Sequence, residues 1–535
     1  MQTVSENWKN AHKQTLLNES YVEVSLDVAD PESLAEAASQ DNGAVYISDT
    51  SEVVSEVDKN IVPYCTLEQN LWLLDGGRKA IPESDYGESG YVGDVLSDDV
   101  CVFSSKTPII TITFPNLKVY DKLIPGITIT WSAAYGEFAD SFVVTAYNGD
   151  TIVAQKEVVG NRSVKSLVWV DIVNYNRIVI QIKKWCLPHH RARVEEVFIG
   201  LRKVYSKTDL FNYSHSQSVD PLSTSLPKTE IKFSIDNTTG EYNPYNEQGM
   251  AKYLMERQEV KSRYGLKLND GSVEWIKGGT FYLSEWYAKQ NGMSADFTAR
   301  DLLEFMSAVH VDKDYKGPSW RRNLYLLAEN VLSEANLPLN SNGTVKWLID
   351  ESLEQIFTTA PLPQDTLANC LQLIANAAKC VLYQDRDGTL HIEPLKEEVS
   401  DYKINSFNSY SKSEITVAKP IKQVVVKVYQ YTIGDKGVES TTTDVVVDVG
   451  TAGEIITIDN PLVTDEDRAR AIGSWVGTHL GHRMTLDSSW RADVRLDALD
   501  IVTNENSYNT NDLRMTEVNF SFNGAFRGTG KGKVI

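Results

Sequence analysis

Short runs of alternating hydrophobic and polar residues recur along most of the chain, and this period of two is typical of half-buried β-strands. The densest series lies in residues 100–204, where turn residues such as Asn148-Gly149-Asp150 separate the runs. Alternating runs also occur at residues 20–28, 230–236 and 420–450. The chain is therefore predicted to be mainly β, with a jelly-roll β-sandwich in its densest part.

A helical period replaces this alternation in residues 319–395. The first helix predicted there has an apolar stripe of Leu326, Leu327, Val331 and Leu332. A second helix is expected over residues 364–380, with Asp365 or Thr366 as its N-cap. A β-hairpin turning at Asp387-Gly388 should follow it.

The stretch IKFSIDNTTGEYNPY, residues 231–245, runs from an alternating strand straight into a group of turn-forming residues. The residues directly after it, 247–260, are predicted to form a helix. Residues 273–289 read as two strands separated at Gly278-Gly279. Nothing in this stretch suggests catalysis, so its role is expected to be architectural.

Length and charge limit the possible functions. At 535 residues the chain exceeds the ~250–300 residues that one core can serve, so several domains are expected. The net charge of −21 disfavours sequence-specific nucleic-acid binding, since phosphates would be repelled. The sequence has neither a transmembrane run nor a signal core, and its five scattered cysteines argue against a disulfide framework. The acidic residues 29–60 suit a mobile or surface-packed arm.

Residues that could carry metal or acid chemistry have simpler explanations. His479 and His482 could share a metal ion, but no third ligand is near in sequence and a helix C-terminus favours histidine. Asp385 and Asp387 fit a hairpin turn better than a calcium loop. Nucleophile, zinc and phosphate-loop motifs are missing from the sequence. No catalytic residue, metal ligand or cofactor is predicted.

One group of aromatic, histidine and arginine residues in the predicted sandwich suggests ligand binding. Aromatic faces stack on sugar rings, and polar groups bind hydroxyls. Trp131 and Trp169 are assigned to the core because they lie within alternating strands. Core or interface packing is also the commoner role for the others. The candidate carbohydrate-binding residues are Trp185, His189, His190, Arg191 and Tyr135.

Two parts of the sequence resemble tail hub proteins of bacteriophages and related contractile injection machines. The first is LPKTEIKFSIDNTTGEYNP with GGTFYLSEWYAKQNGMSADFTARDLLEFM, in residues 226–244 and 278–306. The second is KPIKQVVVKVY with DVRLDALDIVTN and FSFNGAFRGTGKGKV, between residue 419 and the end of the sequence. The shared order is a strand, an Asp-Asn-Gly-Pro turn, a helix and then G-x-F-x-L-x-x-W. These motifs are architectural, so no catalytic residue is carried over.

The resemblance implies a trimer in which each chain supplies two hub-type β-barrels, so that six barrels match a six-fold tail tube above a three-fold tip. The expected fold is thus multidomain and mainly β with α+β parts. Its expected domains are a first hub barrel (1–94 with 205–300), an inserted β-sandwich (95–204), an α/β middle region (301–395) and a second hub barrel (396–535). The inserted part resembles galactose-binding-like sandwiches of carbohydrate-binding modules.

The partners implied by the resemblance are two further chains, the distal tail or tail tube ring, the tape measure protein and tip spike or receptor-binding proteins. The protein would be made in the host cytoplasm and act in the virion, at the tail tip or baseplate, as a non-enzymatic channel-closing component. Two alternatives stay open. One is an adsorption protein that binds host surface glycan through the sandwich, and the weaker one is a cell-wall hydrolase.

Overall fold

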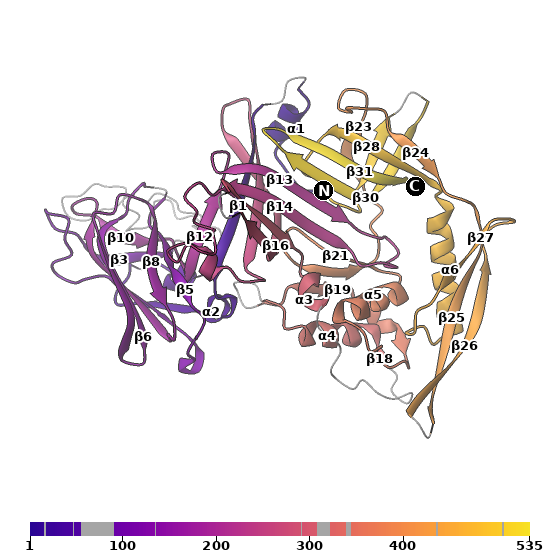
Figure 1. Cartoon of the computed structure of the whole chain (residues 1–535), viewed down its shortest axis with the longest axis horizontal. Helices are drawn as coiled ribbons and strands as arrows, with labels where there is room; N and C mark the ends of the chain where they lie inside the picture. Colours follow the sequence, from indigo (N-terminus) through magenta and orange to yellow (C-terminus); the bar gives the residue numbers. More distant parts are fainter. Residues whose placement is uncertain are drawn as a thin grey trace.

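The computed structural model is mainly β, with several sheets and one helical part in the middle of the chain (Figure 1). This confirms the fold class expected from the alternating pattern. The structure describes residues 1–14, 18–45, 48–54, 90–133, 135–289, 292–307, 322–338, 344–434, 437–505 and 508–535.

The largest sheet in the described part of the chain has 13 strands drawn from both ends of the sequence. In spatial order its first part contains β12 (Gly200–Tyr205), β1 (Ser20–Ala29), β15 (Glu259–Lys267), β16 (Val273–Ala288), β17 (Ser294–Arg300), β14 (Lys228–Asp236) and β13 (Leu210–Ser218). It continues through β30 (Thr510–Phe522), β31 (Phe526–Val534), β28 (Met484–Arg491) and β24 (Glu414–Val417). A branch also starts at β30, where β29 (Ile501–Glu505) pairs with β30 and β23 (Val399–Ile404) pairs with β29.

The two parts of this sheet join directly, because β13 and β30 pair antiparallel from Tyr213–Phe522 to Ser218–Glu517. A single hydrophobic core runs beneath both, including Phe233 of the first part and Phe520 of the second. The strands of the two expected hub barrels lie in one continuous sheet (Figure 1), and the division into two barrels stays a prediction. The β13–β30 pairing joins the two parts, since it removes an edge from each.

The prediction of two strands in residues 273–289 is wrong. Residues 273–288 form one strand, β16, because a register shift opposite Ser262 lets the chain bend without stopping. Gly278 permits this bend, since a Cβ there would lie 2.4 Å from the Ser262 Oγ. A bulge with glycine thus replaces the expected turn.

The helix expected over residues 247–260 is a series of turns with one short 3-10 helix, Ala251–Tyr253. Gly249 packs so closely that a Cβ would lie 2.3 Å from the carbonyl oxygen of Glu241. The Gln258 side chain accepts from Met255 N and donates to Tyr253 O, replacing helical hydrogen bonds. The apolar residues that suggested a helix enter the sheet core from this loop instead.

A second β unit, here called the sandwich, consists of a five-stranded and a three-stranded sheet around one core. Its sheets are β2 (Ala38–Asp41), β4 (Ile109–Thr113), β9 (Arg177–Trp185), β6 (Ala139–Asn148) and β7 (Thr151–Val159), and β11 (Glu196–Phe198), β5 (Ile124–Thr130) and β8 (Lys165–Ile172). The pair β3 (Tyr91–Leu96) and β10 (Arg191–Val194) lies beside them.

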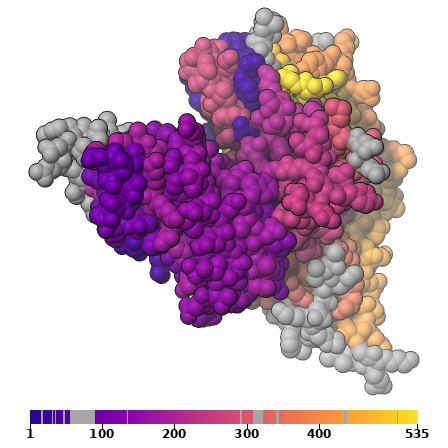
Figure 2. Space-filling model, turned by 60° about the vertical axis from the view of Figure 1, so that its left-hand side comes forward, coloured from indigo at the N-terminus to yellow at the C-terminus, as the bar shows by residue number. Residues whose placement is uncertain are grey.

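The sandwich projects from the main body (Figure 2). The chain enters it after β1 and returns through β12, which pairs antiparallel with β1 from Val24–Tyr205 to Ala29–Gly200. Entry and exit therefore lie on adjacent strands of the large sheet. This geometry lets a whole unit be inserted without disturbing the sheet that carries it.

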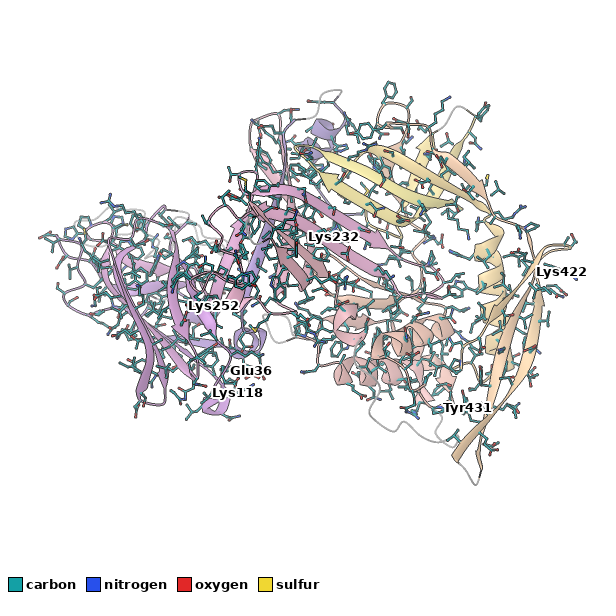
Figure 3. The ribbon with its side chains drawn as sticks, viewed as in Figure 1. Glu36, Lys118, Lys232, Lys252, Lys422 and Tyr431 are labelled. Carbon is teal, nitrogen blue, oxygen red and sulfur yellow. The ribbon has the colours of Figure 1, made fainter. Side chains whose placement is uncertain are left out.

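The acidic segment after β1 packs on the sandwich rather than extending as a mobile arm. It forms α2 (Pro31–Glu36), β2 and the 3-10 helix Thr50–Val54, and β2 pairs with β4. Glu36 accepts from Lys118 Nζ at 3.0 Å, and both side chains lie together at the same end of the sandwich (Figure 3). Residues 55–60 of the proposed arm, and 61–89 of the proposed first domain, lie outside the described residues.

The middle of the chain is helical as predicted. It contains α3 (Leu303–Ser307), α4 (Leu324–Glu334), α5 (Leu367–Ala378), β18 (Arg322–Asn323), β20 (Phe357–Thr358), β19 (Trp347–Ile349), β21 (Val381–Gln384) and β22 (Leu390–Glu393). Thr366 caps α5 by accepting from Asn369 N at 3.2 Å, and β21 and β22 form the expected hairpin. The stripe on α4 is Leu324, Leu327, Val331 and Leu332, while Leu326 is 50% exposed.

The strongest apolar strands of the last third do not join the large sheet. β25 (Ile421–Gly434) pairs with β26 (Gly437–Asp448) and β27 (Glu454–Ile458), and α6 (Glu466–Gly481) packs on this small sheet. Val424, Val426 and Val428 share a core with the middle helices. Residues 420–458 are therefore not part of the expected second barrel. β25 lies along one side of the molecule, where Figure 3 labels two of its residues, Lys422 and Tyr431.

Candidate functional site

Trp185, the leading candidate for sugar stacking, is a core residue. Its side chain is fully buried and meets Trp131 edge to face at a centroid distance of 6.1 Å. Its Nε1 donates to Glu137 Oε2 at 2.8 Å. A ring with no exposed face cannot stack on a sugar, so the structure contradicts the binding role of Trp185.

Glu137 links Trp185 to a second candidate, His190. The Nδ1 of His190 lies 2.9 Å from Glu137 Oε1, and Glu137 is only 4% exposed. Burial disfavours the charged carboxylate, but hydrogen bonds from His190 and Trp185 and the charge of Arg193 outweigh it, so the pKa of Glu137 lies below its ordinary value. No local sequence pattern marks Glu137, because its role depends on contacts between distant strands.

His189 and Arg191 do not join this group. His189 is half-exposed in a loop, with its Nε2 2.9 Å from Asp99 Oδ1. Arg191 is buried and donates from Nη1 to the carbonyl oxygen of Gly93 at 3.1 Å, holding β10 to β3. His189 thus contacts an exposed carboxylate, while Arg191 forms a hydrogen bond with the backbone. The five sequence candidates therefore do not form one binding face.

Tyr135 lies under Arg193, whose guanidinium carbon is 4.1 Å from the centre of the ring. Arg193 is 4% exposed, and its three guanidinium nitrogens have no hydrogen-bond partner in the described part of the chain. The Tyr135 hydroxyl, also buried, likewise lacks one. The cation–π contact with Tyr135 and the charge of Glu137 both stabilise this buried cation.

Trp169, which the sequence assigned to the core, is instead 40% exposed on β8. Lys203 Nζ lies 5.4 Å from the centre of the Trp169 ring. Trp131 is buried as expected, with its Nε1 donating to Ser166 Oγ at 2.8 Å. Trp169 is thus the tryptophan of the sandwich that offers a partly free ring face.

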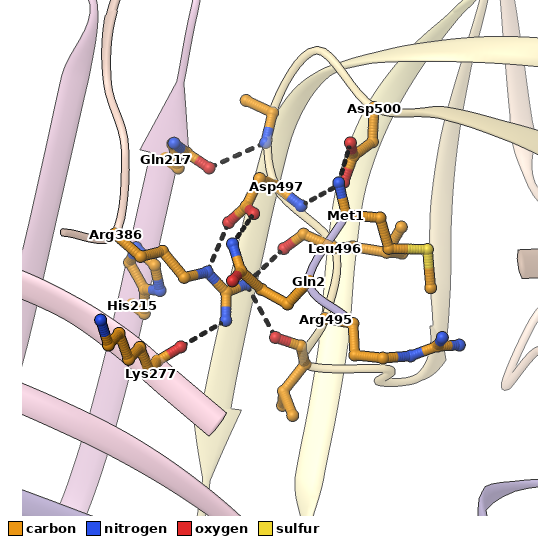
Figure 4. A network of polar contacts seen from close by, with 12 residues as sticks. Met1, Gln2, His215, Gln217, Lys277, Arg386, Arg495, Leu496, Asp497 and Asp500 are labelled. Carbon is orange, nitrogen blue, oxygen red and sulfur yellow. Dashed lines mark hydrogen bonds and ion pairs between the residues drawn. The ribbon is translucent and has the colours of Figure 1, made fainter. Parts of the chain in front are cut away.

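A buried polar network joins the middle region to the large sheet (Figure 4). Arg386, from the β21–β22 turn, donates from Nε to Asp497 Oδ1 at 2.7 Å. Its Nη atoms donate to the carbonyl oxygens of Lys277, Val494 and Leu496 at 2.8–3.0 Å. Burial opposes the charge of Asp497, but Arg386 outweighs it and lowers the pKa of Asp497. This network thus connects the middle region to two other segments of the chain.

The acidic residues of the β21–β22 turn have structural roles. Asp385 accepts from Thr389 N at 2.9 Å and lies 2.8 Å from His391 Nε2, while Asp387 pairs with Lys277 at 2.5 Å. Over the described ranges, no group of three or more His, Cys, Asp or Glu side chains could hold a metal ion. The same part of the chain contains no helix long and apolar enough to span a membrane.

Comparison with known proteins gives a likeness of structure alone. Neither a family model nor a curated protein matches the chain. A 43 kDa tail protein of prophage MuSo2 from Shewanella oneidensis is 14% identical, with a TM-score of 0.41 over 62% of this chain and 95% of that one. A tail protein from Neisseria meningitidis is 10% identical, with a TM-score of 0.42 over 62% of this chain and 93% of that one.

A third similar structure is prophage tail protein gp18 from Listeria monocytogenes, 11% identical, with a TM-score of 0.39 over 62% of this chain and 91% of that one. All three are named as tail proteins. At these identities the similarity is a distant one.

Proposed function

We propose that this protein is a non-enzymatic structural component of a phage tail or tail-like particle, a hub at the distal end of the tail tube. The observation that carries the proposal is the 13-stranded sheet, in which two β parts from opposite ends of the sequence lie side by side through the β13–β30 pairing. A chain built this way supplies two adjacent wall segments. Three such chains would give six segments around a channel.

The outer strand β24 supports assembly into a ring. It lies at the end of the sheet order, and all four of its residues are exposed, with Ile415 at 61% and Val417 at 56%. An exposed edge strand that carries apolar residues such as Ile415 and Val417 invites pairing with another chain. An obligate trimer would cover it in an interface well above the ~1,600 Å² of a standard complex.

The charge of the chain fits a wall around passing DNA. With a net charge of −21, a channel lining of this protein would repel phosphates and let DNA slide. The partners of such a hub are the tail tube ring and the tape measure protein above it, and a spike or receptor-binding protein below. It would be made in the host cytoplasm and would act in the virion.

The test is the mass and symmetry of the purified protein, by light scattering and then averaged particle images. A ring of three chains with six similar lobes around a pore is the expected result. A protein that stays monomeric at high concentration would overturn the trimeric hub.

A second candidate function, binding of host surface glycan, has one observation in its favour. The partly exposed ring of Trp169, beside Lys203, could stack on a sugar. A glycan array probed with the intact protein tests this. Binding that is lost in Trp169→Ala and kept in Trp185→Phe would support it.

A further inference from the structure

A cleft of about 520 Å³ lies between the middle region, one side of α6 from Arg468 to His479, and Arg514 of β30. It gathers positive charge in a chain whose net charge is −21. Its basic lining residues are Lys379, Arg468, Arg514, His479 and His482, and Glu397 and Ile535 also line it. The local excess of cationic groups is opposite in sign to the rest of the molecule.

Two arginines of this cleft have donors that the protein does not use. Arg514 is 2% exposed and binds Lys396 O and Glu397 Oε2 through its Nη atoms, each at 2.9 Å, but its buried Nε has no partner among the described residues. Arg468 donates from Nε to Ala377 O at 2.7 Å, while no described residue accepts from its buried Nη2. Buried donors are nearly always satisfied, so these two indicate a missing acceptor.

The cationic groups around the cleft also lower one another's pKa values. Burial and the charges of Lys533, Arg514 and His482 lower the pKa of His479 to about 4, with only Asp220 opposing them. Burial, followed by the charge of Arg468, lowers the pKa of Lys379. The surroundings thus contain too little negative charge to balance the positive groups.

We propose that this cleft binds an acidic peptide segment of a partner protein, whose carboxylates accept hydrogen bonds from Arg468 and Arg514. Planar guanidinium groups are suited to carboxylates, and such charge-assisted bonds are the strong ones. This inference does not depend on the hub role. It requires only that a partner presents Asp or Glu side chains.

The shape and lining of the cleft favour a peptide over a free inorganic anion. Its volume exceeds the ~30 Å³ share of one water molecule many times over, so a single small anion would fill little of it. Ile356, Leu395 and Trp475 line it beside the cationic groups. An acidic residue flanked by an apolar one matches this combination. A nucleic acid would meet repulsion from a chain whose net charge is −21.

Binding should be coupled to protonation of His479. A carboxylate nearby favours the charged imidazole, so the bound state has the higher His479 pKa. By linkage, protonation then strengthens binding by the same factor. Affinity should therefore rise as the pH falls from 7 toward 5, before the carboxylates of the peptide are themselves protonated. Lys533, Arg514 and His482 oppose that protonation and Asp220 favours it, while Lys379, Arg468 and Glu397 are the other charged residues that line the cleft.

The first test uses the full chain and a labelled synthetic peptide of alternating Glu and Leu, with fluorescence anisotropy at low salt. A matched peptide with Gln in place of Glu is expected to bind about tenfold more weakly or worse. Equal binding of the two peptides would overturn the proposal. Tighter binding of a single-stranded oligonucleotide or of inorganic sulfate than of the Glu peptide would overturn the peptide assignment.

A pair of variants on α6 localises the binding. Arg468→Gln should weaken the Glu peptide about tenfold, while Arg470→Gln should leave it unchanged, because Arg470 pairs with Glu466 and Asp467 outside the cleft lining. Equal losses in both variants would reduce the effect to general electrostatics and contradict the site. Should Arg468→Gln fail to fold, NMR titration of His479 in the unmodified chain decides, since its pKa must rise when the peptide is added.

Discussion

Arg386 and Asp497 form a buried ion pair, 2.7 Å from Nε to Oδ1, that fastens a hairpin turn of the middle region to the large sheet. The Arg386 side chain is 5% exposed, and its remaining donors bind three backbone carbonyl oxygens. The pair therefore joins segments more than one hundred residues apart in sequence through one side chain.

Removing this arginine should strongly destabilise the protein. Arg386→Leu leaves Asp497 without its charged partner, with Gln2 Nε2 as a remaining donor, and breaking a buried pair in this way costs about 3–5 kcal/mol. The lower denaturation midpoint would appear in chemical unfolding followed by tryptophan fluorescence. Arg470→Leu, which breaks exposed pairs on α6, serves as the control and should change stability by less than about 1 kcal/mol. Similar midpoints for the two variants would contradict the structural role of Arg386.

Asp301 should make stability depend on pH. It accepts from Thr229 N and Leu303 N, but burial dominates and raises its pKa from 3.8 to about 7. The folded state therefore holds this proton more tightly than the unfolded state. Its stabilising contribution is complete below pH 4 and is lost as the pH rises through 7.

Asp301→Asn removes this titration. The stability of the variant relative to that of the unmodified protein should therefore increase from pH 4 to pH 8. His215, whose pKa burial lowers to about 3, contributes with the opposite sign and is present in both proteins. Melting temperatures measured across this range would check the result. Parallel curves for the two proteins would show that Asp301 is not the titrating group.

Truncation of Trp185 should lower the stability of the protein far more than truncation of Trp169. Trp185→Ala should lower stability by about 3–5 kcal/mol, because it opens a cavity beside Trp131 and leaves Glu137 without one donor. Trp169→Ala should have an effect within about 1 kcal/mol, since its ring is partly in solvent. Thermal melts of both variants are the measurement, and equal losses would contradict the assigned burial.

The helix α6 should tolerate alanine at one glycine and not at another. A Cβ at Gly473 would lie 2.6 Å from Val447 Cγ2 on β26, so Gly473→Ala should cost about 1–3 kcal/mol through overpacking. Gly481 has nothing within 4 Å of that position. Gly481→Ala is thus the matched control. Its denaturation midpoint should fall less than that of Gly473→Ala.

Exposed apolar residues of β24 should matter for assembly more than for folding. Ile415→Lys should leave the melting temperature of the isolated chain nearly unchanged, because the side chain is 61% exposed. In the proposed ring, a buried lysine at the subunit edge would oppose association. Light scattering of the variant should show a smaller particle. A trimer of normal stability would exclude β24 from the interface.

Local signals in the sequence predicted those elements whose stability is local. Thr366 caps α5 and Asn148-Gly149-Asp150 turn the β6–β7 hairpin, because caps and tight turns depend on a few neighbouring residues. The helix expected at 247–260 failed because tertiary packing of Gly249 against Glu241 overrides an apolar pattern. Propensity decides only where packing does not.

The faces of strands were harder to assign than the strands themselves. In β8, Leu167 and Trp169 point to one face and Val168 and Val170 to the other, so both faces look apolar. The sequence alone could not tell which face the second sheet covers, and Trp169 was placed inside. The cleft between α6 and Arg514 had no local signal either, since its charges come from segments far apart in the chain.

The pairing of β13 with β30 has a consequence for how the chain is made. β13 is complete by residue 218, but its partner begins at residue 510, so almost three hundred residues must be synthesised before the two can meet. During that interval β13 presents an uncovered edge on the ribosome-bound chain. Non-local pairings of this kind form slowly. A nascent chain halted before β30 would therefore be a substrate for chaperones and prone to aggregate.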